Sequence, residues 1–171
     1  MIVSKEEAAF LWKASWLSFV SGVFAIWHHE NTRSLAIIPI GVWLTSMNYW
    51  RHPIYDWRRI LDMAYVHVGL CYQSYVAYFY RENTVWYFLF VSLAMGCYLL
   101  SIWVAKYNSW KGTYIHGCVH VLGNIANVLL YLSITKRERT CYQSSSFISG
   151  CVKKDKFFFQ TDTPQSQLTK D

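Results

Sequence analysis

Two histidines, His116 and His120, lie four residues apart in the apolar stretch GTYIHGCVHVLGNIANVLLY at 112–131. Residues at i and i+4 share one face of a helix, so both imidazoles are expected on the same side, one turn apart. Such a pair, completed by a ligand from a neighbouring helix, makes an open zinc site whose bound water becomes a nucleophile near neutral pH. Histidines in apolar helices also form hydrogen bonds between helices, and the spacing alone leaves both interpretations open.

A second group of polar residues lies at the ends of two other apolar stretches. Ser46 and Asn48 end one stretch and His52 follows it, while Asp62 and His67 lie near the start of the next. An Asp beside a metal-bound water orients that water or acts as its general base. Ionisable groups are costly inside a bilayer, and those that occur there usually serve a function. For His67 we favour an interhelical hydrogen bond, with a role as third metal ligand as the alternative.

The composition predicts an integral membrane protein. Of the 171 residues, 54% are hydrophobic, 19% are aromatic and only 15% are charged, whereas about a quarter are charged in a typical soluble domain. The formal net charge is +6, but seven of the sixteen basic residues follow Leu132. A basic tail describes this distribution better than a nucleic-acid surface, and we expect no nucleic-acid partner. The five cysteines form no CxxC motif and are expected to be free thiols.

Five apolar stretches have about the 20-residue length that a membrane span requires. They lie at 8–27, 34–50, 60–80, 84–105 and 112–134. Their short connections predict antiparallel neighbours packed as a bundle. Small residues are expected to let the helices approach closely, namely Gly41, Gly69, Gly96, Gly117 and Gly123.

The sequence thus predicts an all-α, multi-pass membrane bundle of about five transmembrane helices at 1–134, followed by a flexible polar and basic tail at 135–171. With five spans, the N-terminus and the connections at 51–59 and 106–111 lie on the same side of the membrane, here called side A. All the polar residues introduced above lie toward side A, so the fold can bring them into one layer. Membrane lipids are the expected partners, and the sequence does not identify the membrane.

The chain carries SMNYWRHPIYDWRRILDM at 46–63 and IHGCVH at 115–120. This arrangement resembles the superfamily of alkaline ceramidases, progestin and adiponectin receptors and related seven-helix membrane hydrolases. Its pattern is Ser-x-x-x-His at the end of the second helix, an Asp opening the third, and His-x-x-x-His in the last. The resemblance implies that His116 and His120 bind zinc. It also implies that Asp62 and Ser46 support a zinc-bound water that hydrolyses a lipid amide or ester.

The chain departs from that pattern at two points. Trp50, not a histidine, stands four residues after Ser46, so His52 becomes the third ligand only if the second helix ends differently. The chain also has five expected spans where the family has seven. Three functions remain open: a zinc-dependent lipid hydrolase, a non-catalytic membrane scaffold or receptor with the same bundle, and a b-type haem protein. The haem protein would use His67 with His116 or His120 as axial ligands.

Overall fold

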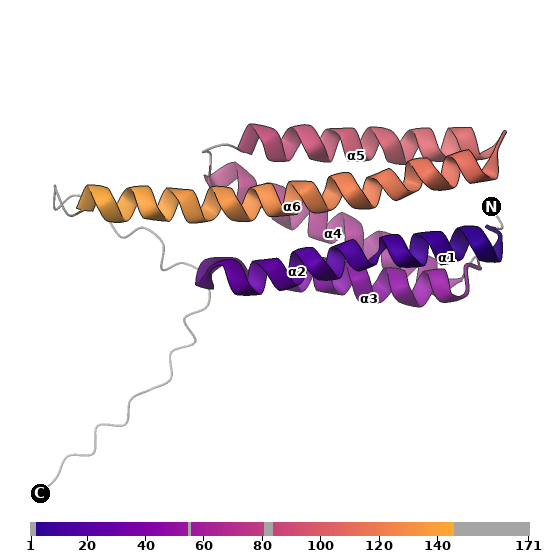
Figure 1. The fold of residues 1–171 in the computed structure, drawn as a ribbon, viewed down its shortest axis with the longest axis horizontal. Helices are drawn as coiled ribbons and strands as arrows, with labels where there is room; N and C mark the ends of the chain where they lie inside the picture. The colour runs from indigo at the N-terminus through magenta and orange to yellow at the C-terminus, as the bar shows by residue number, and fades with distance from the viewer. Residues whose placement is uncertain (1–2, 55, 81–83, 146–171) are drawn as a thin grey trace, which may run out of the picture. The chain divides into compact units, whose positions relative to one another are not determined.

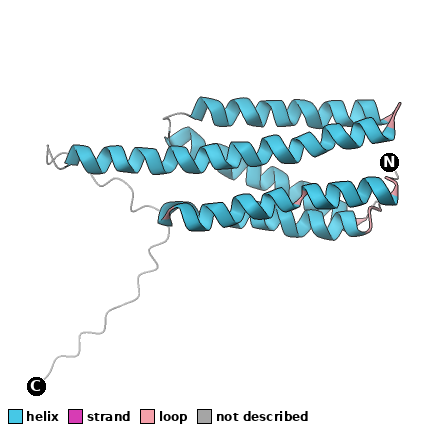
Figure 2. Cartoon of the chain, viewed as in Figure 1, coloured by secondary structure: helices cyan, strands magenta, loops and turns pink. Residues whose placement is uncertain are grey.

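The computed structural model describes residues 3–54, 56–80 and 84–145, and these are helical apart from short turns, with no strand among them (Figure 2). The elements in chain order are α1 Lys5–Ala14, α2 Trp16–His28, the 3-10 helix η1 Glu30–Ala36, α3 Ile37–Arg51, α4 Trp57–Tyr80, α5 Thr84–Ala105 and α6 Ser109–Ser145 (Figure 1). The all-α prediction is confirmed. The boundary predicted at 134/135 falls within α6, and residues 146–171 of the predicted tail lie outside the described residues.

All five apolar stretches are helical, and three of them are long and apolar enough to cross a membrane. These three are Lys5–His28, Thr84–Ala105 and Ser109–Arg137, judged by length and composition. The second stretch is divided between η1 and a 15-residue α3, and at about 1.5 Å per residue α3 alone falls short of a bilayer core of roughly 30 Å. The 24-residue α4 is long enough but carries several polar side chains. A span by these two stretches therefore stays a prediction.

Side-chain caps fix the beginnings of the three helices that start at the end of the bundle predicted to face side A. At α1 the side chains of Ser4 and Glu7 each accept a hydrogen bond from the other's backbone N–H, which satisfies two donors that a helix start leaves free. Asp56 accepts from the backbone N–H of Arg58 at the start of α4. Asn108 accepts from the N–H of Lys111 at the start of α6. Figure 1 shows the N-terminus and the α5–α6 turn at the same end.

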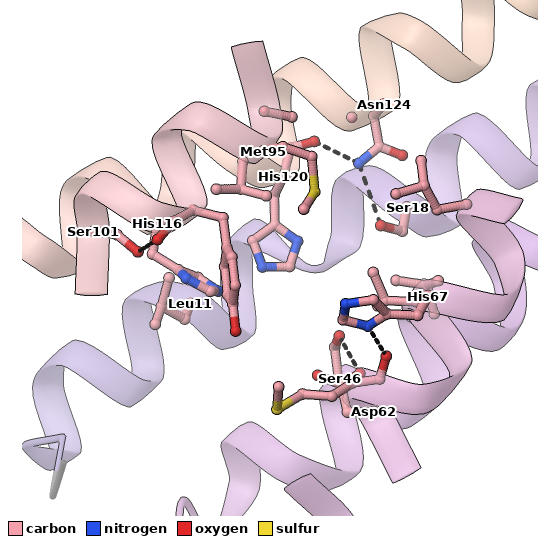
Figure 3. Close-up of a pocket in the computed structure, with 18 of the residues that line it drawn as sticks. Leu11, Ser18, Ser46, Asp62, His67, Met95, Ser101, His116, His120 and Asn124 are labelled. Carbon is pink, nitrogen blue, oxygen red and sulfur yellow. Dashed lines mark hydrogen bonds between the residues drawn. The ribbon is translucent and has the colours of Figure 1, made fainter. Parts of the chain in front are cut away.

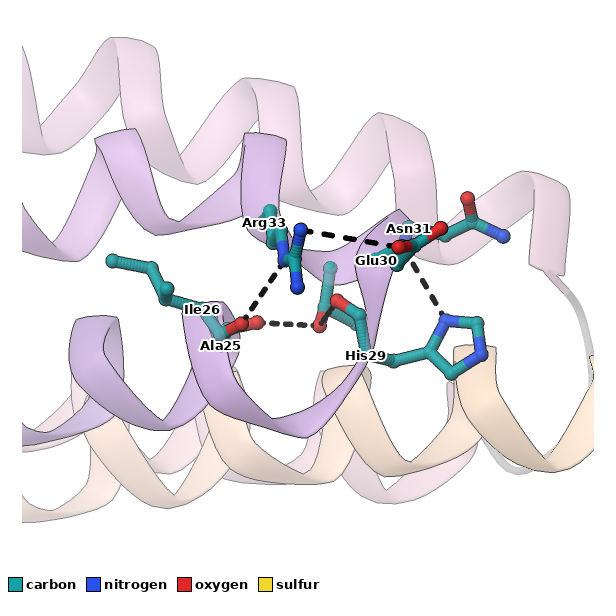
Figure 4. A network of polar contacts seen from close by, with 7 residues as sticks. Ala25, Ile26, His29, Glu30, Asn31 and Arg33 are labelled. Carbon is teal, nitrogen blue, oxygen red and sulfur yellow. Dashed lines mark hydrogen bonds and ion pairs between the residues drawn. The ribbon is translucent and has the colours of Figure 1, made fainter.

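The charged turn between the first two stretches forms η1 rather than an irregular loop. The Thr32 hydroxyl, which is buried, donates to the carbonyl oxygens of Ala25 at 2.6 Å and His29 at 2.8 Å. The Arg33 Nε donates to the carbonyl of Ile26 at 3.3 Å and its guanidinium lies 4.0 Å from Glu30 (Figure 4). These bonds satisfy carbonyls at the end of α2, so the chain reverses direction into α3 within a few residues.

Two buried clusters hold the helices together. The larger cluster draws side chains from α2, η1, α4, α5 and α6, with Ala25, Leu35, Ala77, Tyr87 and Leu130 among its members. The smaller cluster joins α1 to α3 on side A and contains Ala8, Leu11, Tyr49 and Trp50. Large apolar side chains elsewhere remain exposed on every helix from α2 to α6. Such an outer surface is what a helix facing lipid presents.

The predicted role of the glycines is confirmed at three positions and wrong at two. A side chain on Gly41 would collide with Tyr65, one on Gly69 with Ile38, and one on Gly117 with Phe10. These glycines let α3 approach α4 and let α1 approach α6. A side chain on Gly96 or Gly123 would meet nothing within 4 Å. Glycine composition alone does not reveal which face of a helix packs against a neighbour.

Candidate functional site

A cavity of about 510 Å³ lies among the helices, and residues from all six α-helices line it. Most of the lining is apolar, with Leu11, Val42, Leu70, Val91 and Val119 as examples from five different helices. The predicted site residues on the lining are Ser46, Asp62, His116 and His120. Figure 3 shows them around the cavity together with His67 and Asn124. The structure thus brings together four of the five residues assigned to catalysis or metal binding.

Asp62 is held by two hydroxyl groups from α3. Its Oδ1 accepts from the Ser46 hydroxyl at 2.8 Å and from the Thr45 hydroxyl at 2.7 Å. Ser46 is buried, with 1% of its surface exposed. A buried carboxyl oxygen that accepts hydrogen bonds avoids much of the cost of its removal from water. The two hydroxyls therefore fix the orientation of the Asp62 side chain on the cavity wall and satisfy one of its oxygens.

His116 and His120 form the expected pair on one face of α6. Their ring centroids are 5.6 Å apart, with the rings at 66° to each other. The Nε2 of His120 is buried and has no hydrogen-bond partner. An unsatisfied buried polar atom is uncommon and costs roughly 1–3 kcal/mol. The pair therefore presents an imidazole nitrogen that can still accept or donate a hydrogen bond.

His52 does not join this pair. It follows the last residue of α3, is exposed, and is absent from the cavity lining. Trp50 lies on the lining instead, with its ring centroid 5.7 Å from that of His116. An indole N–H donates hydrogen bonds and has no lone pair for a metal. The side chains present therefore do not fit the three-histidine zinc site that the resemblance implies, and among the described residues no group of three or more His, Cys, Asp or Glu is placed to hold a metal ion.

His67 lies on α4 across the cavity from α6. Its Nδ1 lies 2.6 Å from the carbonyl oxygen of Met63 and donates to it, because a carbonyl can only accept. In the neutral ring this leaves the Nε2 lone pair free to act as an acceptor or ligand. The rings of His67 and His120 point toward one another in Figure 3. Among the described residues the expected hydrogen bond of His67 to another helix is not found, since Met63 lies one turn away in α4.

Two polar contacts at the cavity involve residues that were not among the site residues predicted from the sequence. Thr45, next to Ser46, bonds Asp62. Asn124 links α6 to α2, because its Nδ2 donates to the Ser18 hydroxyl at 3.2 Å and its Oδ1 accepts from the Ser21 hydroxyl at 2.6 Å. Asn124 thus joins two helices through side-chain hydrogen bonds. Ser18 and Ser21 are three residues apart, which places both on one face of the first apolar stretch. This spacing is the sequence signal from which the contact could have been predicted.

Comparison with known proteins gives no match to a family model, to a curated protein or to a solved structure. The resemblance to the ceramidase and adiponectin receptor superfamily therefore rests on the motif residues and their order in the chain.

Proposed function

We propose that this chain is a multi-pass membrane protein whose helices enclose a binding cavity for a lipid-like molecule. In this proposal it is a non-catalytic scaffold or receptor with the bundle type of the ceramidase and adiponectin receptor superfamily. The observation that carries the proposal is the cavity of about 510 Å³, apolar along most of its wall and lined by every α-helix. Cavities of roughly 300–1,000 Å³ with a few convergent polar groups are typical of small-molecule sites.

The outer surface supports a membrane setting for the stretches that contain α3, α4 and α5. Val68 on α4 is 68% exposed, Ile37 on α3 is 66% exposed and Val85 on α5 is 75% exposed. In water such residues would form large apolar patches, which soluble monomers rarely expose. In a bilayer the same residues contact acyl chains at no cost. The short α3 reaches sufficient length when η1, which continues directly into it, is counted with it.

The non-catalytic form of the proposal rests on Trp50. This residue occupies the place of the first metal ligand in the superfamily's motif, and its ring packs against His116. A metal bound by His116 and His120 would lack the third protein ligand that open zinc sites have, because among the described residues His67, on the opposite wall, forms no three-residue metal group with them. The cavity walls themselves remain suited to an acyl chain, which requires only apolar contact along its length.

A second function, hydrolysis of a lipid amide or ester, is favoured by one specific observation. The bonded pair Ser46 and Asp62 lies on the same cavity as His116 and His120. The test is turnover of ceramide-like and monoacyl lipids by the purified chain, with and without added zinc. Turnover that disappears in Asp62→Asn would establish this function. A Soret band in the same preparation would instead identify the haem protein.

Filling the cavity is expected to abolish lipid binding. Ala94 on α5 is buried and lies on the lining, so Ala94→Phe places a ring where the ligand would lie. We expect its affinity for a radiolabelled oleoyl lipid, measured on the full chain in detergent, to fall at least about tenfold, or roughly 1.4 kcal/mol. Ser92→Phe is the matched control, because Ser92 is exposed on the same helix and outside the lining. Equal binding by both variants would contradict the proposal.

A further inference from the structure

Trp50 offers the cavity a hydrogen-bond donor that nothing in the described chain uses. It is 8% exposed, its Nε1 has no hydrogen-bond partner, and it lies on the lining. Its ring is positioned by contacts with Tyr49, at 4.6 Å between centroids, and with His116. An indole N–H in a buried position usually finds an acceptor. A hydrocarbon chain supplies none, so a molecule that satisfies Trp50 must carry a hydrogen-bond acceptor, such as a carbonyl oxygen, at that point.

Two cationic side chains also belong to the lining. Arg59 lies in the first turn of α4, and Lys106 directly follows α5. Both are therefore at the end of the cavity that faces side A in the predicted topology. Asp62 is the one carboxylate on the described lining, so the two cations outnumber it. The charge at this end of the cavity favours an anion.

Lys106 and the indole of Trp50 lie at different depths along the helices. Lys106 precedes the start of α6, whereas His116, which contacts Trp50, is seven residues past Ser109. At about 1.5 Å per residue this places the Trp50 layer roughly 10 Å deeper than the start of α6. Beyond it the lining continues with apolar residues such as Leu70 and Val91, and the polar side chains of Gln73, Asn124 and Asn127 lie among them. The order from side A inward is thus Lys106, the indole donor and a mainly apolar wall.

Resting on the proposed lipid-binding function, we infer that the ligand is a single-chain acyl lipid with an anionic headgroup. Arg59 and Lys106 bind the anion, the Trp50 N–H donates to the carbonyl oxygen of the acyl linkage, and the acyl chain lies along the apolar wall. In this assignment Trp50 is a ligand-binding residue, which accounts for a tryptophan on the wall beside His116. The headgroup and the carbonyl are recognised by separate side chains, so their contributions can be measured separately.

The experiment compares three probes on the full chain in a neutral detergent, each by displacement of a fluorescent lipid. They are oleoyl lysophosphatidate, its ether analogue without a carbonyl, and neutral monooleoylglycerol. We expect the wild type to bind the ester at least about threefold more tightly than the ether, the size of one net hydrogen bond. We expect it to bind the ester at least about tenfold more tightly than the neutral lipid, the size of a close interaction with two cations.

Each variant is expected to remove one preference and leave the other. Trp50→Phe keeps the aromatic ring and abolishes the preference for ester over ether, while the preference for the anion remains. Lys106→Gln reduces the preference for the anion at least about threefold and keeps the preference for the ester. The matched controls are Trp43→Phe and Lys111→Gln, and both are expected to keep both preferences because neither residue lies on the lining. Trp43 is a close match to Trp50, because its Nε1 is also buried without a partner among the described residues.

Three results separate the inference from the function on which it rests. If the wild type binds all three lipids equally, or if Trp43→Phe acts like Trp50→Phe, the inference is wrong and the proposed function stands. If none of the three lipids displaces the fluorescent lipid, the proposed function fails as well. The comparison of ester and ether on the wild type needs no variant, so misfolding of a variant leaves the inference testable.

Discussion

Replacing Gly41 with valine is expected to destabilise the fold by about 2–4 kcal/mol. A side chain at this position on α3 would collide with the ring and hydroxyl of Tyr65 on α4. Overpacking a close helix contact costs about 1–3 kcal/mol. Tyr65 cannot move aside freely, because its hydroxyl donates to the carbonyl oxygen of Ile37 at 2.9 Å, and losing that bond adds about 1 kcal/mol. The measurement is unfolding of the purified chain in mixed detergent micelles, followed by tryptophan fluorescence.

The same substitution at Gly96 on α5 is the control, because a side chain there meets nothing within 4 Å. Gly96→Val is expected to be neutral or slightly stabilising, since glycine is the poorest helix former apart from proline. Combining Gly41→Val with Tyr65→Ala removes the obstructing ring and is expected to restore part of the lost stability. Equal stabilities for Gly41→Val and Gly96→Val would show that α3 and α4 do not approach as the structure has them.

Truncating Leu130 on α6 is expected to destabilise the fold by about 2–4 kcal/mol. Leu130 is fully buried in the larger core cluster, among residues of α2, α4 and α5. A buried Leu→Ala change leaves a cavity and commonly costs about 2–5 kcal/mol. In lipid the transfer contribution is smaller, but the lost packing contacts remain. Unfolding in mixed micelles measures the loss. Leu132→Ala, two residues away and 43% exposed, should change stability by less than about 0.5 kcal/mol, and an equal loss at both positions would contradict the packing of α6.

Hydropathy and turn chemistry were sufficient to predict most of the helices. The five apolar stretches became helical, and Pro53 stands just beyond the end of α3 at Arg51, as its geometry requires. The extent of α6 was underestimated. Its extension TKRERTCYQSS is polar but rich in residues with good helix propensity. The polar composition after Ile134 was interpreted as the end of the helix. In the structure the helix continues through this polar segment to Ser145.

The site was predictable where it depended on helix periodicity and order. His116 and His120 share a face of α6 because they are four residues apart, and Asp62 meets Ser46 because α3 and α4 adjoin at side A. His52 was misplaced because α3 ends one residue before it. Its backbone has φ −144° and ψ 83°, so its side chain does not continue the face of the helix. The contact between Trp50 and His116 depends on how α3 packs relative to α6, and no local sequence pattern encodes this packing.

The central claim is that a lipid enters the cavity among the helices, and photo-crosslinking with a lipid that carries a photoreactive acyl chain tests it most directly. Val91 and Val119 lie on the cavity lining, whereas Val68 and Val85 are exposed on the outer surface. The account predicts labelling of the peptides around Val91 and Val119 that excess unlabelled lipid removes. Labelling confined to the surroundings of Val68 and Val85, unchanged by competitor, would contradict it.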